Sequence, residues 1–362
     1  MFELKRGSTL TLATLFLSGR CGSALAAAPA DWSDIDAKSI VLFYPGQSTY
    51  DWLLSETHKK GYEKVPAGAR CFKCHEEDEE SVGEARIDAS ELDGIADKSP
   101  TIEMDVQAAY DAANLYLRFQ WLGDSEGSSE KADALGLMID DGSVKRFDKQ
   151  GCWLTCHNGM RDATDEATKA QVKSHELLGK SLKKSDVRKY LPATRSENST
   201  SWTETRSADE IAKLKATGKF LDLMQWQVAR SNPYGMAEDG YVLEYRIYDK
   251  GKKMFSWNVD KKTMTPKFMF DKEKTGYIAL KEQDFTNPAK AIAIIKEVNA
   301  KAYNPKAGFK AGDILPGRLV TTATSGSAGD NDDAKGSWKN GMYTMVFKRK
   351  LNTGHPEDDK IL

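Results

Sequence analysis

Residues 110–121, YDAANLYLRFQW, contain a turn followed by a strand, and this pattern indicates how the chain folds. The turn is predicted at Asp111–Asn114, where Asp and Asn bound the segment. From Leu115 to Trp121 the side chains alternate with period two, as in a half-buried strand. The stretch therefore predicts a β-hairpin.

Further strand patterns follow this hairpin along the chain. Residues 135–139, LGLMI, form an apolar run that ends in the turn Asp140–Gly142. Similar runs lie at 223–229, 241–248, 277–280, 319–324 and 343–348. Gly-, Asn- and Asp-rich turns separate them, without the regular strand–helix alternation of a parallel α/β sheet. We expect a mainly β fold, an antiparallel β-sandwich, with helical or irregular insertions at 45–95, 165–190 and 206–218.

Composition excludes several classes of protein. The chain has 362 residues, of which 40% are hydrophobic and 29% charged, a balance typical of globular proteins. Its 52 basic and 54 acidic residues give a formal net charge of -2, which argues against a nucleic-acid partner. Because no apolar run is long enough to span a bilayer, we expect no transmembrane segment.

The first 26 residues have the pattern of an export signal. Lys5 and Arg6 precede the apolar stretch 10–17, and Ala24-Leu25-Ala26 offers a small-residue cleavage site. This pattern predicts a periplasmic or extracellular protein. A lipid anchor at Cys21 is the alternative, which the preceding Arg20 disfavours.

The first cysteine motif is Cys71-Phe72-Lys73-Cys74-His75, or C-x-x-C-H. This order is the signature of c-type haem attachment. The two thiols add to the vinyl groups of one porphyrin, and the histidine ligates the iron. A redox C-x-x-C or half of a zinc site is the alternative, but it lacks a βαβ context and a matching second half.

A second motif, Cys152-Trp153-Leu154-Thr155-Cys156-His157, has three residues between its cysteines. We interpret it as a second covalent attachment site, with His157 on the iron, because a histidine again follows the second cysteine directly. The alternatives are a local disulfide between Cys152 and Cys156, or a free pair beside a non-covalent haem.

Each iron also needs a sixth ligand, or an open position if chemistry occurs there. His58, 13 residues before Cys71, could fold back over the first haem. His175 lies on a helical-looking stretch after the second motif and is a candidate for the second haem, although a solvated helix face is the alternative. Met138 and Met160 are thioether alternatives, and core packing is the default role of any methionine. We expect His355 to lie in a loop.

Three predicted segments follow from these motifs. They are a signal peptide at 1–26, an N-terminal haem-attachment segment at 27–100, and a β-sandwich domain at 101–362 that carries the second motif in an insertion at 150–190. The Gly- and Asp-rich loop 325–335 offers Asp330, Asp332 and Asp333 as possible calcium ligands, but we favour a solvated loop.

Several segments together resemble a known family. They are 40–47, 108–118, 151–157, 189–195 and 336–341. The chain, from about residue 39 to 351, is similar to the haem-binding domain related to the γ subunit of ethylbenzene dehydrogenase, and more closely to its cytochrome c-552-type members. This resemblance implies an immunoglobulin-like β-sandwich that holds haem, in an electron carrier or a haem subunit of a molybdenum oxidoreductase. The γ subunits bind haem b through Met and Lys; Met138 matches the methionine, whereas Gln stands at 225 or 227 where lysine is expected.

The function that we predict is a dihaem c-type cytochrome, with two covalently attached haems, that moves single electrons between redox protein partners. The acidic run 76–80 could steer a basic partner, and the lysine-rich segment 169–189 has the opposite charge, although both could be solvated faces. Electron transfer rather than catalysis is the expectation. The alternatives are a haem enzyme with an open iron site, a subunit of a molybdenum oxidoreductase, and a self-associating, polymerising cytochrome.

Overall fold

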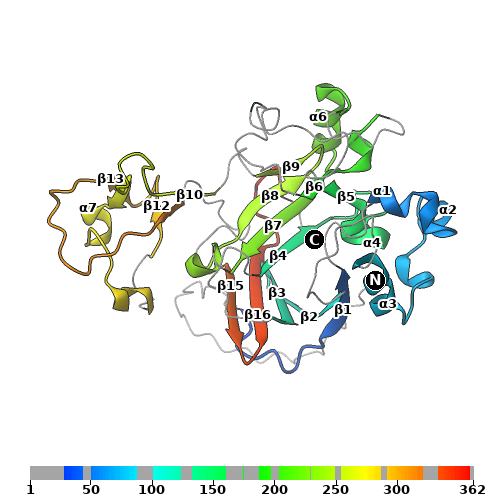
Figure 1. Cartoon of the computed structure of the whole chain (residues 1–362), viewed down its shortest axis with the longest axis horizontal. Coiled ribbons are helices and arrows are strands. Elements are labelled where there is room, and N and C mark those ends of the chain that lie inside the picture. The colour runs from blue at the N-terminus through cyan, green and yellow to red at the C-terminus, as the bar shows by residue number, and fades with distance from the viewer. Residues whose placement is uncertain are drawn as a thin grey trace, which may run out of the picture.

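The computed structural model describes residues 28–43, 50–87, 101–123, 133–159, 174, 187–196, 204–228, 230–248, 254–286, 292–320 and 333–358. Two antiparallel sheets make up its centre (Figure 1). The first has the order β1-β2-β3-β16-β15. Its strands are β1 (Lys38–Phe43), β2 (Thr101–Tyr110), β3 (Asn114–Leu122), β15 (Ala334–Lys339) and β16 (Met342–Lys350).

The second sheet has the order β4-β7-β8-β9. Its strands are β4 (Ala134–Ile139), β7 (Leu221–Gln227), β8 (Glu238–Val242) and β9 (Arg246–Tyr248). Large apolar side chains from both sheets form one buried cluster, because alternate residues of each strand point to the same face. The indole rings of Trp121 on β3 and Trp226 on β7 meet edge to face at 6.1 Å across the two sheets. A mainly β sandwich is therefore confirmed.

The predicted hairpin is β2–β3, with Tyr110 paired to Leu115. Asp111 closes its turn by accepting hydrogen bonds from the backbone N–H groups of Ala113 and Asn114 at 2.7 and 2.8 Å, and from the hydroxyl of Tyr116 at 2.8 Å. These bonds lower the pKa of Asp111 to about 2, the bond from Ala113 having the largest effect.

Short helices carry the first cysteine motif at one end of the molecule (Figure 1, right). They are α1 (Tyr50–Leu53), η1 (Glu56–His58), α2 (Gly61–Lys64), η2 (Cys71–Lys73) and α3 (Glu79–Ile87). The segment with the second motif packs against them and consists of α4 (Phe147–Gln150), η3 (Gly151–Leu154), β5 (Cys156–Gly159) and β6 (Val187–Lys189). Side chains of Gln150 and Arg146 donate hydrogen bonds to the carbonyls of Val65 and Pro66, at 2.8 and 2.9 Å. Two segments far apart in sequence are thus joined.

Residues 254–320 include a separate group of small sheets that extends to the opposite end (Figure 1, left). Their strands are β10 (Phe255–Trp257), β11 (Phe268–Phe270), β12 (Ile294–Ile295), β13 (Ala300–Ala302) and β14 (Arg318–Val320), with helices α7 (Lys272–Thr275) and η8 (Glu282–Thr286). Two small apolar clusters fill this lobe, and one of them includes Met236 next to η6 (Asn232–Tyr234) of the main body.

Some strand predictions were wrong in detail. Residues 241–242 are the end of β8 and residues 246–248 are the whole of β9, because the chain reverses at 243–245. Residues 277–280 form no strand; Leu280 makes a single bridge to Ile314. The helical prediction at 206–218 is confirmed by α6 (Ala208–Ala216). This helix begins with a capping box formed by Ser207 and Glu210. Of the predicted helical or irregular insertion at 165–190, the structure describes only residues 174 and 187–190.

The described part of the chain includes no helix of the length and hydrophobicity that a membrane crossing needs.

Candidate functional site

The first cysteine motif forms one tight turn. The backbone N–H groups of Cys74 and His75 both donate to the carbonyl of Cys71, each at 3.1 Å. Cys71 is half-buried and Cys74 is exposed, and both are free thiols. Burial raises the pKa of the Cys71 thiol. The turn thus holds two thiols and an imidazole at the surface within five residues.

The imidazole rings of His58 and His75 lie close to one another. Their centroids are 6.2 Å apart and their planes differ by 15°. A metal-bound imidazole nitrogen lies about 2 Å from the metal and roughly 1.2 Å from its own ring centre, so two rings on opposite sides of one ion stand about 6.4 Å apart. The observed centroid spacing of 6.2 Å is close to this value.

The hydrogen bonds of these two rings select the nitrogen that faces a metal. The Nδ1 atom of His58 lies 2.9 Å from the carbonyl oxygen of Leu53, which can only accept, so Nδ1 carries the proton. The Nδ1 atom of His75 lies 3.3 Å from a carboxylate oxygen of Asp78 and donates in the same way. With Nδ1 as the donor, Nε2 is the nitrogen left to bind a metal, the arrangement typical of metal-binding histidines.

Gly61, the first residue of α2, lies directly against His58. A Cβ atom at this position would be 2.2 Å from Cε1 of the His58 ring, so any larger residue would displace the ring. Trp52 of α1 covers the same ring, with centroids 4.8 Å apart. The position of His58 thus depends on Gly61 and Trp52.

The second motif has a different environment. Cys152 is exposed, Cys156 is buried, and both are free thiols. The His157 ring is buried and stacks on the Tyr190 ring, with centroids 3.5 Å apart and planes 4° from parallel. Its Nε2 atom lies 3.2 Å from the Tyr190 carbonyl oxygen, so it donates there. The thiols suit covalent attachment, but in this conformation Nε2 of His157 is turned to the backbone.

Two further side chains lie beside Cys156. The ammonium of Lys189 donates to its sulfur at 2.8 Å. The hydroxyl of Thr155, the preceding residue, is 3.7 Å from the sulfur of Met138 on β4. Of the predicted distal candidates, the structure therefore brings His58 to the first motif and Met138 to the second.

Helix α1 lies between the two motifs. Its Trp52 contacts the His58 ring, and its Tyr50 meets the His157 ring edge to face at 5.8 Å. Leu53 of the same helix supplies the carbonyl that accepts from His58. One short helix therefore contacts residues of both motifs.

The remaining candidate residues from the sequence lie in different parts of the chain. His175, Met160, Asp330 and Asp332 lie outside the described residues. Asp333 is buried and forms an ion pair with Lys348 at 3.5 Å. His355 lies in a segment after β16, as expected, and forms an ion pair with Asp358 at 3.8 Å. The acidic run 76–80 is mostly exposed.

The sequence interpretation missed the residues that orient the histidines. Asp78 lies three residues after His75 within the acidic run, and that spacing is a signal that could have been used. The contacts of Trp52, Tyr50 and Tyr190 join segments distant in sequence, so no local pattern indicates them.

The fold and the motifs define a β-sandwich protein with two cysteine–histidine sites on inserted segments. The family model described as ethylbenzene dehydrogenase matches residues 31–362, and the chain belongs to this family. The resemblance found in the sequence is thereby confirmed.

Two similar proteins are named as cytochromes. The chain is 31% identical over 242 residues to a cytochrome c-552 of Stutzerimonas stutzeri, covering 64% of this chain and 68% of the relative. It is 33% identical over 137 residues to a cytochrome c-551 of Rhodocyclus tenuis, covering 36% of this chain and 56% of the relative.

Proposed function

We propose that this protein is an exported c-type cytochrome with two covalently attached haems that carries single electrons between redox proteins. The observation that carries the proposal is the pair His58 and His75, whose rings are spaced for one iron and whose protons both lie on Nδ1. Membership of the family and similarity to two cytochromes support it. Haem supplies an iron that gains and loses one electron.

At the first site, Cys71 and Cys74 would hold the porphyrin, with His75 and His58 on the two faces of the iron. Asp78 would strengthen His75 as a ligand by accepting its Nδ1 proton. If His75 and His58 both held the iron, no position would be left for a small substrate, and the site would favour electron transfer.

At the second site, Cys152 and Cys156 would hold the porphyrin, with His157 and Met138 as axial ligands. His157 must then release the Tyr190 carbonyl to present Nε2. His175 remains the other distal candidate from the sequence.

The two sites differ in their charges. The acidic run 76–80 directly follows the first motif, and its Asp78 contacts His75. At the second motif, Lys189 contacts Cys156, and the guanidinium of Arg195 lies 3.7 Å from the Tyr190 ring centre. Positive charge disfavours the more positive ferric state, and a Met ligand raises the potential further. We therefore expect the second site to have the higher reduction potential.

A redox titration with carbon monoxide binding tests this proposal. An electron carrier with both irons six-coordinate gives two one-electron transitions and binds carbon monoxide slowly or not at all. Rapid carbon monoxide binding to the reduced protein would contradict it and favour a haem enzyme with an open site.

The family name supports one second candidate, a haem subunit of a larger oxidoreductase. In that case the protein would copurify from its native source with a catalytic subunit in constant ratio. Isolation as a free protein would exclude this function.

The segment boundaries belong to the same proposal. Export requires removal of residues 1–26, and the segment 27–100 and the insertion 150–190 would each carry one haem on the sandwich. An N-terminal sequence of the secreted protein that begins near residue 27 is the expected result.

A further inference from the structure

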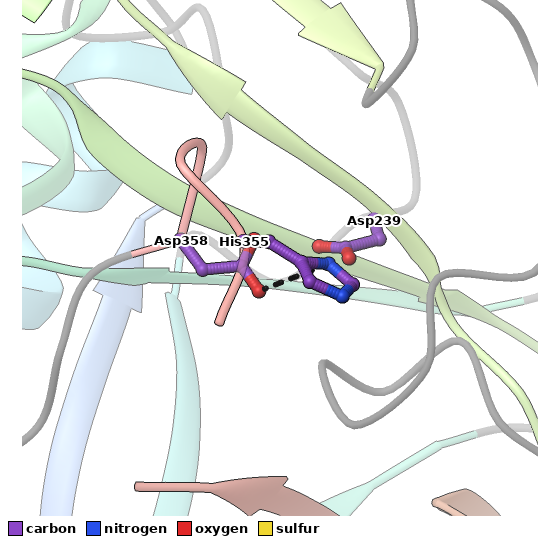
Figure 2. Close-up of side chains that lie close together, drawn as sticks. All are labelled: Asp239, His355 and Asp358. Carbon is purple, nitrogen blue, oxygen red and sulfur yellow. Dashed lines mark ion pairs between the residues drawn. The ribbon is translucent and has the colours of Figure 1, made fainter. Parts of the chain in front are cut away.

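A cluster of two buried carboxylates and one half-buried imidazole lies outside both cysteine motifs. It consists of Asp239 on β8 and of His355 and Asp358 in the segment that follows β16. One ligand atom from each residue lies within 4.8 Å of the others. Figure 2 shows the Asp358 carboxylate directed at the imidazole, with the Asp239 carboxylate beside the same ring.

Both carboxylates are withdrawn from water. Asp239 is 4% exposed and Asp358 is 9% exposed. Among the described residues, no donor lies at full hydrogen-bond geometry to either side-chain oxygen of Asp358; its polar neighbours are the His355 imidazole, 3.8 Å away, and the Thr353 side chain. A buried carboxylate with so few hydrogen bonds is costly unless a cation compensates it.

Two cations lie near the cluster. The guanidinium of Arg349 attracts Asp358 through space and also forms a buried ion pair with Asp222. Lys215 pairs with Glu357 at 3.0 Å. The cluster itself brings two buried carboxylates and one imidazole together, a set of oxygen and nitrogen ligands that a metal cation can bind.

We propose that Asp239, His355 and Asp358 bind one divalent first-row transition-metal ion such as zinc. Calcium and magnesium prefer sites made of oxygen alone, whereas imidazole with carboxylates suits zinc and its neighbours. Three protein ligands leave a fourth position for water.

The position of the site indicates what the ion does. Asp239 belongs to the four-stranded sheet, whereas His355 and Asp358 follow the last strand of the five-stranded sheet. A shared ion fastens the C-terminal segment to the facing sheet and stabilises the native state by mass action. The inference does not depend on haem.

The test measures zinc on the haem-loaded mature protein, after alkylation of any thiol that haem does not occupy, because free cysteines also bind zinc. After chelator treatment and dialysis against zinc, we expect the wild type to bind one zinc per chain that His355→Gln does not bind. Zinc should raise the melting temperature of the wild type, and chelator should lower it again. His355→Gln and Asp358→Asn should each weaken zinc binding at least tenfold.

Glu357→Gln is the matched control, since it removes one negative charge from the same segment but pairs with Lys215. It should bind zinc like the wild type. The proposal is overturned if the wild type binds no zinc, or if His355→Gln binds as tightly as the wild type. His355 is the more exposed ligand, with 28% of its side chain accessible, so its variant serves if Asp358→Asn does not fold.

Discussion

The imidazole rings of His58 and His75 lie 6.2 Å apart, centroid to centroid, with planes that differ by 15°, although 17 positions separate the two residues in the sequence. Each ring donates its Nδ1 proton to an oxygen of its own segment. The proposed ligation of one iron by both residues would account for the spacing and for the common tautomer.

Replacement of His58 tests the axial ligand. His58→Ala should open the sixth position and convert the first haem to a high-spin state that binds carbon monoxide. His58→Met should keep six-coordination and raise that haem's midpoint potential by about 0.1 V, a part of the range of ~0.8 V that axial ligands span. Optical spectra and redox titration check both results. Unchanged spectra in His58→Ala would show that another residue is the ligand.

Gly61→Ala tests whether the position of the ring matters, because the new Cβ would be 2.2 Å from the His58 ring. We expect a weakened or mixed-spin first haem with the second unaffected. Gly136→Ala on β4 is the matched control, because its new Cβ would meet nothing within 4 Å, and it should leave the spectrum of the first haem unchanged. A normal spectrum in Gly61→Ala would refute this positioning role.

Asp78→Asn tests the outer partner of His75. Loss of an anionic acceptor makes the imidazole a weaker donor to ferric iron, so the first midpoint potential should rise by tens of millivolts, on the order of 30 mV. Glu80→Gln removes the same charge from the same run without touching His75 and separates the local bond from the general field. Equal shifts in both variants would indicate that the negative charge of the run as a whole, and not the hydrogen bond from His75 to Asp78, sets the midpoint potential.

The fold was more predictable from the sequence than the sites. The hairpin at 110–121 and the strands at 135–139 and 343–348 follow from local alternation, which decides which face is buried. The split of 241–248 into β8 and β9 depends on pairing with β7, which lies outside the segment itself.

The cysteine motifs were evident because attachment chemistry requires adjacent residues. The contacts of Trp52 with His58 and of Tyr190 with His157 depend on how separate segments pack, and the sequence has no local signal for them. The lobe at 254–320 was missed because its strands are only two or three residues long.

Two glycines on strands provide a matched pair for the sandwich. A Cβ at Gly336 on β15 would be 2.4 Å from Cζ2 of the buried Trp226, whereas one at Gly136 on β4 would meet nothing within 4 Å. Gly336→Ala should lower the free energy of unfolding by about 1–3 kcal/mol. Gly136→Ala should be neutral or slightly stabilising. Urea unfolding measures both, and equal effects would contradict the packing of Trp226 beneath β15.

The Asp111 carboxylate makes the stability of the folded state depend on pH. Its folded pKa of about 2 lies below the usual value of about 3.9, so its bonds stabilise the fold above that usual value and are lost as pH falls toward 2. The wild type should exceed Asp111→Asn in stability at pH 7, and the difference should shrink between about pH 4 and pH 2. A difference that stays constant over this range would show that the carboxylate charge has no part in the turn.

The central claim is that two haems are covalently attached, and the intact mass of the purified protein under denaturing conditions tests it most directly. Covalent haem survives unfolding, so the account predicts two additions of ~616 Da each to the mass of the mature chain, one lost when Cys71 and Cys74 become Ala and the other when Cys152 and Cys156 do. A single addition would limit attachment to one motif, and a mass equal to that of the polypeptide alone would contradict the account.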